Sequence, residues 1–267
     1  MESRNPAFRG NAFGQQTGWR REQGLQPGAQ PYMYGAPPAA PPAVRPMTLD
    51  DVVVRGFLTL ATLVVTAALA WALIPVELAV PVLVVSMIAS LGVWAFITFG
   101  RNAKAPLVMA FAALYGVMVG IISHAYNDVY HGVVFQAVIG TALAFGAMLA
   151  VHALRIIRVT PKFTRFVIAA GFALIGLMLI NLVVQLFGGE DGIGIRDPGN
   201  PLAYVFSVVA ILVGCFFLLL DFDSIEQGVR HGAPESFAWY CAFGLVLSLV
   251  WIYLELLRFL SYFAGRD

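Results

Sequence analysis

The stretch VVVRGFLTLATLVVTAALAWALI, residues 52–74, decides the fold class of this chain. Apart from Arg55 and a few threonines it is apolar, and Pro75 follows it directly. A helix needs about 20 predominantly apolar residues to cross the hydrocarbon core of a bilayer. The stretch therefore predicts a membrane-spanning helix. Just before it, Thr48-Leu49-Asp50-Asp51 has the spacing of a capping box, in which a hydroxyl and a carboxylate satisfy backbone N–H groups where a helix begins.

Six further apolar stretches of similar length follow along the chain. They cover residues 78–99, 105–123, 133–154, 166–187, 201–220 and 237–263. The composition agrees, because 60% of the residues are hydrophobic and only 12% are charged, whereas a soluble domain carries about 25% charged residues. We therefore predict an all-α membrane protein, with seven transmembrane helices bundled over residues 47–267.

Residues 1–46 differ sharply from the rest, since they are rich in proline, glycine and arginine. A segment with so little to bury is expected to be a disordered tail. Lys and Arg also gather after the second and fourth apolar stretches, and cytoplasmic loops carry such an excess. We therefore expect the tail on the cytoplasmic side and the 188–200 loop outside, with the protein in a cell membrane, the plasma membrane of a bacterium.

Acidic side chains at the end of the sixth stretch are the main candidates for function. Asp221 directly follows an unbroken apolar run, and Asp223 and Glu226 come shortly after it. Ionisable groups inside membrane segments are costly and usually functional, although these three can also simply mark the membrane interface. Glu255 stands three residues before Arg258, on the same helix face. A local ion pair and a role in an ion pathway both remain open for it.

Other features indicate architecture rather than chemistry. Gly116-x-x-x-Gly120 is a spacing that lets two membrane helices approach closely, and Asn181 can form hydrogen bonds across the bundle. The four histidines do not match a zinc template, and no phosphate loop or nucleophile motif is present. We expect no enzyme activity and no cofactor. With a net charge of only +1, we expect the lipid bilayer and other membrane proteins as partners, and no nucleic acid.

The last two apolar stretches resemble the end of the Bax inhibitor-1 family of seven-helix membrane proteins. Leu220-Asp221-Phe222-Asp223-Ser224-Ile225 is similar to the family's tyrosine-aspartate motif, with an isoleucine four residues after the acid. Leu254-Glu255-Leu256-Leu257-Arg258-Phe259-Leu260 is similar to its leucine-leucine-arginine ending, and Asn181 falls where the family often has an asparagine. The resemblance implies a pH-sensitive calcium leak, controlled by two aspartates near the inner end of a closed bundle.

The resemblance can be carried to individual positions of this chain. Asp221 corresponds to the first aspartate, but Ser248 stands where the second is expected, so the paired-acid sensor is incomplete. The family's latching arginine corresponds to Arg101, which implies a closing Asp221–Arg101 pair, and Asp223 or Glu226 can stand in for the missing acid. Calcium is favoured as the transported ion because carboxylate oxygens suit it.

The alternative is a non-conducting regulator of membrane stress or proteolysis that acts through protein contacts. The surroundings of Asp221 distinguish the two functions, since a polar cavity that reaches Asp221 would favour conduction.

Overall fold

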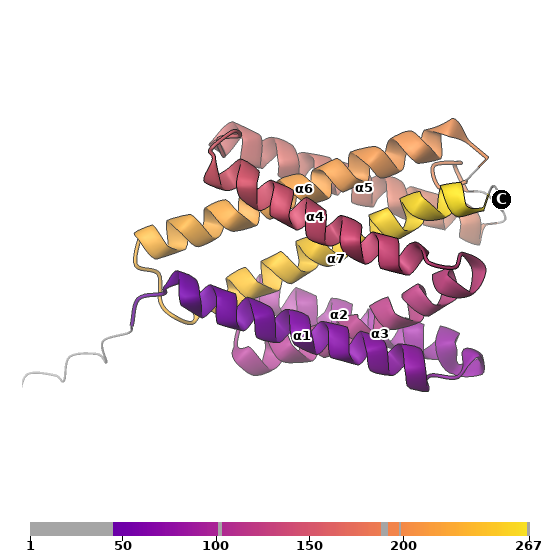
Figure 1. Ribbon diagram of the computed structural model, residues 1–267, viewed down its shortest axis with the longest axis horizontal. Helices are drawn as coiled ribbons and strands as arrows, with labels where there is room; N and C mark the ends of the chain where they lie inside the picture. The colour runs from indigo at the N-terminus through magenta and orange to yellow at the C-terminus, as the bar shows by residue number, and fades with distance from the viewer. Residues whose placement is uncertain (1–44, 101–102, 188–191, 198, 266–267) are drawn as a thin grey trace, which may run out of the picture. The chain divides into compact units, whose positions relative to one another are not determined.

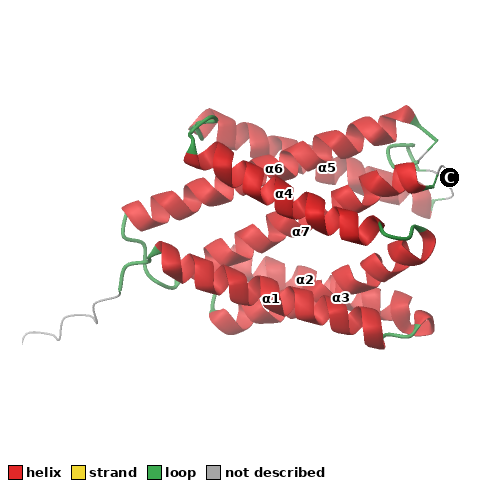
Figure 2. Ribbon diagram, in the orientation of Figure 1, coloured by secondary structure: helices red, strands yellow, loops and turns green. Residues whose placement is uncertain are grey.

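The computed structural model describes residues 45–100, 103–187, 192–197 and 199–265. Within them the chain forms seven long helices, shown in Figures 1 and 2. These are α1 (Leu49–Leu73), α2 (Val76–Gly100), α3 (Ala105–Val129), α4 (Val133–Ala153), α5 (Pro161–Leu186), α6 (Pro201–Arg230) and α7 (Phe237–Ala264). All seven are long and apolar enough to cross a membrane. The predicted all-α architecture with seven membrane helices is confirmed.

Three helices extend by five residues or more beyond the apolar stretches that predicted them. α3 continues to Val129 rather than ending near residue 123, and α5 begins at Pro161 rather than near residue 166. α6 runs on for ten residues past Leu220 and ends at Arg230, so that Asp221 and its acidic neighbours are helical. Hydropathy marks where a segment becomes too polar for hydrocarbon, whereas backbone hydrogen bonds continue until a cap or a turn ends the helix.

α7 lies in the middle of the bundle. It packs against α1, α3, α4 and α6, while α5 contacts only α6 among the helices described. In Figure 1, α7 runs between the pair α4 and α6 on one side and the pair α1 and α3 on the other. Such central placement explains why α7 is the most buried of the seven helices although it is not the most hydrophobic.

α1 and α3 approach each other through the two glycines that the sequence singled out. A Cβ atom on Gly116 would overlap Thr66 and the carbonyl of Leu63, and one on Gly120 would overlap the backbone of Ala67. Only a residue without a side chain permits this distance between the two helices. The spacing of Gly116 and Gly120 thus places both glycines on the face of α3 that touches α1.

The loops gather at two ends of the bundle. One end, which we call the basic end, holds Arg45, Lys104, the 154–160 turn and the 231–236 turn (Figure 1). The opposite end holds residues 74–75, 130–132 and the 192–200 loop. α6 therefore runs from the opposite end towards the basic end, and α7 runs back.

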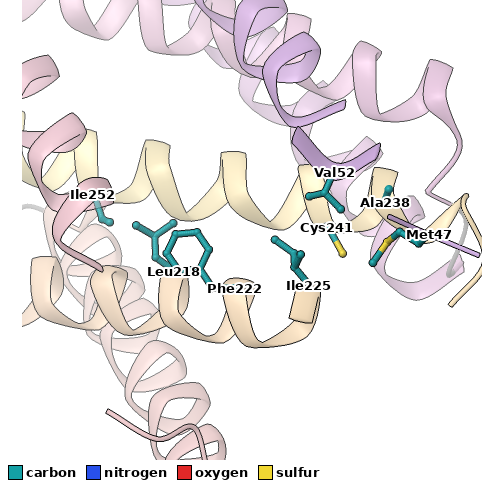
Figure 3. Packing of buried hydrophobic residues seen from close by; sticks show 8 residues of the cluster. All are labelled: Met47, Val52, Leu218, Phe222, Ile225, Ala238, Cys241 and Ile252. Atoms are coloured by element: carbon teal, nitrogen blue, oxygen red, sulfur yellow. The ribbon is translucent and has the colours of Figure 1, made fainter. Parts of the chain in front are cut away.

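A buried cluster joins α6, α7 and the start of α1 (Figure 3). Its members are Met47, Val52, Leu218, Phe222, Ile225, Ala238, Cys241 and Ile252. The capping box predicted at the start of α1 is present, since Thr48 and Asp51 exchange side-chain and backbone hydrogen bonds. Ahead of it, the N–H of Met47 donates to the carbonyl of Ala233 at 2.7 Å. α1 is therefore attached by its first residues to the turn between α6 and α7.

Candidate functional site

Asp221 lies on α6 and faces α7. Its Oδ2 atom accepts a hydrogen bond from Ser248 Oγ at 2.5 Å. One turn before Ser248 stands Gly244, where a Cβ atom would come within 2.8 Å of Asp221 Oδ1. Gly244 and Ser248 are four residues apart and share a helix face. The glycine leaves room for the carboxylate, and the serine supplies its donor.

Ser248 occupies the position that the resemblance assigns to a second aspartate. The structure places Asp221 and Ser248 in direct contact across the α6–α7 interface. The contact joins a hydroxyl donor to a carboxyl acceptor, and with Asp221 ionised it is a charge-assisted hydrogen bond. Two carboxylates sharing one proton would have behaved differently. This chain therefore has the geometry of a paired site with only one titratable member.

Asp223 and Glu226 do not take the place of the missing acid. Asp223 Oδ2 accepts a hydrogen bond from Gln227 Nε2 at 2.6 Å, within α6 itself. Glu226 contacts three basic side chains: His152 at 3.1 Å, Arg230 at 2.6 Å and Arg155 at 3.8 Å. Both acids are thus occupied by partners other than Asp221 and Ser248, because the helix turns their side chains away from α7.

A polar cavity of about 590 Å³ opens beside these two acids at the basic end. It lies between the end of α4, the 154–160 turn and the last turns of α6. Asp223 and Glu226 line it together with Arg155 and Arg158, but Asp221 is not one of its lining residues. Among the described residues, the cavity therefore reaches the acids one turn beyond Asp221 and stops there.

Glu255 is buried nearer the opposite end, and its ion partner is not the residue that its spacing suggested. Arg196, from the 192–200 loop, donates to Glu255 Oε1 at 2.9 Å, and its guanidinium also lies over the ring of Phe206. The second carboxylate oxygen is buried without a hydrogen-bond partner. The i, i+3 spacing had left a local pair with Arg258 open as one of two interpretations. The returning loop instead brings a closer cation, which the sequence could not place.

Asn181 and Arg101 complete the predicted set. Asn181 is buried on α5, and its Oδ1 accepts a hydrogen bond from the backbone N–H of Ile193 at 3.0 Å. It therefore holds the start of the 192–200 loop rather than another helix. Gly192, beside it, has a φ of +62° and leaves no space for a side chain against Asn181. Arg101 lies outside the described residues.

One ionic cluster was not predicted from the sequence. Glu235, in the turn between α6 and α7, pairs with both Arg55 of α1 and Arg45. The hydrogen bond to Glu235 is the main reason why the pKa of Arg45 rises above its ordinary value. Arg55 was visible as a lone charge in an apolar stretch. Its partner was not, because a single acid in a short turn has no periodicity from which to predict a contact.

The described residues contain no group of three or more His, Cys, Asp and Glu side chains that could hold a metal ion. Asp221 has a serine beside it, and Glu226 contacts two arginines and His152.

Comparison with known proteins agrees with the seven-helix membrane architecture. A search of curated proteins gave no match to the chain. A family model described as Bax inhibitor 1 like matches residues 5–265. The matched range includes all seven helices and both partners of the Asp221–Ser248 hydrogen bond. The chain is a multi-pass membrane protein and belongs to the Bax inhibitor 1-like family.

Proposed function

We propose that the protein is a pH-sensitive cation leak, with calcium as the favoured ion, controlled at Asp221. The observation that carries this proposal is the contact between Asp221 and Ser248, which joins α6 to α7 inside two membrane helices. Each ionisable group in a membrane segment opposes insertion, so a carboxylate at this position is expected to serve a function. The oxygen ligands that a carboxylate offers suit calcium.

In the proposed closed state the carboxylate holds α6 and α7 together. Charge-assisted hydrogen bonds are roughly twice as strong as neutral ones, so protonation of Asp221 weakens its bond to Ser248. The two helices then separate more easily, and the polar cavity at the basic end can extend towards Asp221. The closing pair of Asp221 with Arg101 remains part of the proposal and adds a Coulomb attraction that protonation also removes.

We also propose how the bundle is oriented across the membrane. We place the basic end and the tail on the cytoplasmic side, because Lys and Arg concentrate in cytoplasmic loops. Arg155, Arg158 and Lys104 all lie in connections at that end. The 192–200 loop then faces outward, in the plasma membrane of a bacterium. We propose no catalytic role.

A second candidate is a non-conducting regulator of other membrane proteins. It is favoured by one observation, namely that the polar cavity stops before Asp221. Leu218 and Phe222, on either side of Asp221 in α6, are both buried in the apolar cluster. In this second case the Asp221–Ser248 bond would only join two helices, and the surface of the bundle would carry the function.

Reconstitution of the full chain in liposomes that enclose a calcium-sensitive dye separates the two candidates. We expect calcium entry to depend on pH between about pH 5 and pH 8. We expect D221N to lose that dependence, because an amide carries no titratable charge. The matched control is D223N, which removes the same charge two residues away on the same helix.

The outcomes distinguish the candidates clearly. A pH-dependent flux that D221N abolishes and D223N keeps would support control at Asp221. A flux that D221N leaves unchanged across the pH range would reject that control. If the wild-type protein passes no calcium at any pH while remaining folded by circular dichroism, the regulator becomes the better description.

A further inference from the structure

The cavity at the basic end has a second property that the leak does not use. Three arginines line it, Arg155, Arg158 and Arg230, against two carboxylates, Asp223 and Glu226. One net positive charge remains before His152, which also lines the cavity, is counted.

Both carboxylates in the cavity are already engaged by protein groups. Glu226 is bound by His152, Arg155 and Arg230, and Asp223 is bound by Gln227. Each guanidinium nevertheless carries several N–H donors in a planar fork. Arg158 pairs with no acid in the described part of the chain. Donors therefore outnumber acceptors in the cavity, and the excess is cationic.

The backbone after α4 brings two arginines to the cavity. Arg155 has a φ of +53°, a left-handed conformation that a residue with a side chain rarely adopts. It follows Leu154, the C-cap of α4, and both Arg155 and Arg158 line the cavity. Such conformations persist where the surroundings impose them, and they concentrate at binding sites. The cavity volume also lies in the range of small-ligand sites, roughly 300–1,000 Å³.

We infer that this cavity binds a phosphate group through Arg155, Arg158 and Arg230. The planar fork of a guanidinium matches two oxygens of a phosphate. The cavity lies where α4 and α6 end. This is the level where a bilayer presents its head groups, and basic pockets of this kind bind anionic lipids. Ile157 and Val159 add an apolar wall. An anionic lipid fits both features, because its phosphate can meet the arginine donors and its apolar part can meet this wall. A soluble phosphate fits only the donors.

The test uses the full chain in a neutral detergent. Phosphatidylglycerol is added stepwise, and bound lipid is counted by native mass spectrometry. We expect one saturable site in the wild-type protein. We expect R158Q to weaken it about tenfold, equivalent to about 1.4 kcal/mol, and the double variant R155Q/R158Q to abolish it. The control is R165Q, which removes the same charge from an exposed position on α5 outside the cavity.

A parallel titration with inorganic phosphate, followed by thermal unfolding, distinguishes the source of the phosphate. Stabilisation by inorganic phosphate that R158Q abolishes and R165Q keeps would assign the site to a soluble ligand; the same pattern with lipid alone would assign it to a head group. Equal weakening by R158Q and R165Q would overturn the inference, since it would reflect only diffuse surface charge. Absence of saturable binding of either probe would overturn it as well.

Discussion

Two carboxylates within this bundle, the half-buried Asp221 and the buried Glu255, are stabilised in different ways. Asp221 receives a neutral hydroxyl from Ser248, whereas Glu255 receives the guanidinium of Arg196. A buried ion pair contributes little net stability, but removing one partner leaves an uncompensated charge. The two sites should therefore respond differently to loss of a partner. Asp221 is held by the weaker interaction, as expected of a group that gains and loses a proton.

At the scale of residues, we predict that E255Q destabilises the protein. It leaves Arg196 buried without a counter-ion, which costs about 3 kcal/mol. The measurement is unfolding in detergent, followed by circular dichroism. The double variant R196Q/E255Q should recover part of the loss, because the two residues act as a pair.

The control for this prediction is E77Q, at an exposed position in the first turn of α2. Its effect should be within about 0.5 kcal/mol. If E255Q and E77Q unfolded alike, the Arg196–Glu255 pair would have no stabilising role. If the double variant were no better than E255Q alone, the loss would come from another contact of Glu255.

At the scale of the helices, the α1–α3 contact depends on two glycines, which have no side chain. Gly116 and Gly120 are one turn apart on α3, and each faces the backbone of α1. Membrane helices associate mainly through close van der Waals packing, because lipid chains are as apolar as leucine. The sequence predicted that a tight contact exists here. It did not identify α1 as the partner, because a pair of small residues marks one helix face and not its neighbour.

We predict that G120A destabilises the bundle by about 1–3 kcal/mol, since the added methyl group overlaps the backbone of Ala67 and forces the helices apart. Unfolding in detergent measures the effect. The control is G92A on α2, where a Cβ atom meets nothing within 4 Å. Alanine favours helix over glycine by up to about 1 kcal/mol, so G92A should be neutral or stabilising. Equal effects of both variants would show that the contact does not limit helix approach.

At the scale of the whole molecule, the ionic cluster around Glu235 joins segments that are far apart in the sequence. It ties Arg45 and Arg55, at the start of the described chain, to the turn that connects α6 and α7. A β-bridge between Pro46 and Pro234 supports the same junction. The segment that enters α1 is therefore attached to the hairpin that carries Asp221 and Ser248.

We predict that E235Q loosens this junction. Two arginines lose their common counter-ion, and the amide of Met47, which donates to Ala233, should exchange faster with deuterium. Hydrogen exchange followed by mass spectrometry of the peptide around residues 45–48 measures this change. The control is D50N, which removes a charge from an exposed site in the first turn of α1. Equal exchange in wild type and E235Q would show that the backbone bridge alone holds the segment.

The number of helices, their order and their approximate lengths followed from the sequence by itself. The physical reason is that an apolar segment of bilayer length has one stable state in lipid, a helix that satisfies its own backbone groups. The capping box also followed from a short, regular spacing. The place of Ser248 opposite Asp221 followed from the resemblance to the Bax inhibitor-1 family. Only the tertiary structure decided which charges pair, namely Arg196 with Glu255, Glu235 with Arg45 and Arg55, and Glu226 with Arg155. Those pairs join parts of the chain far apart in sequence, and no local spacing encodes a contact that forms when loops fold back onto helices.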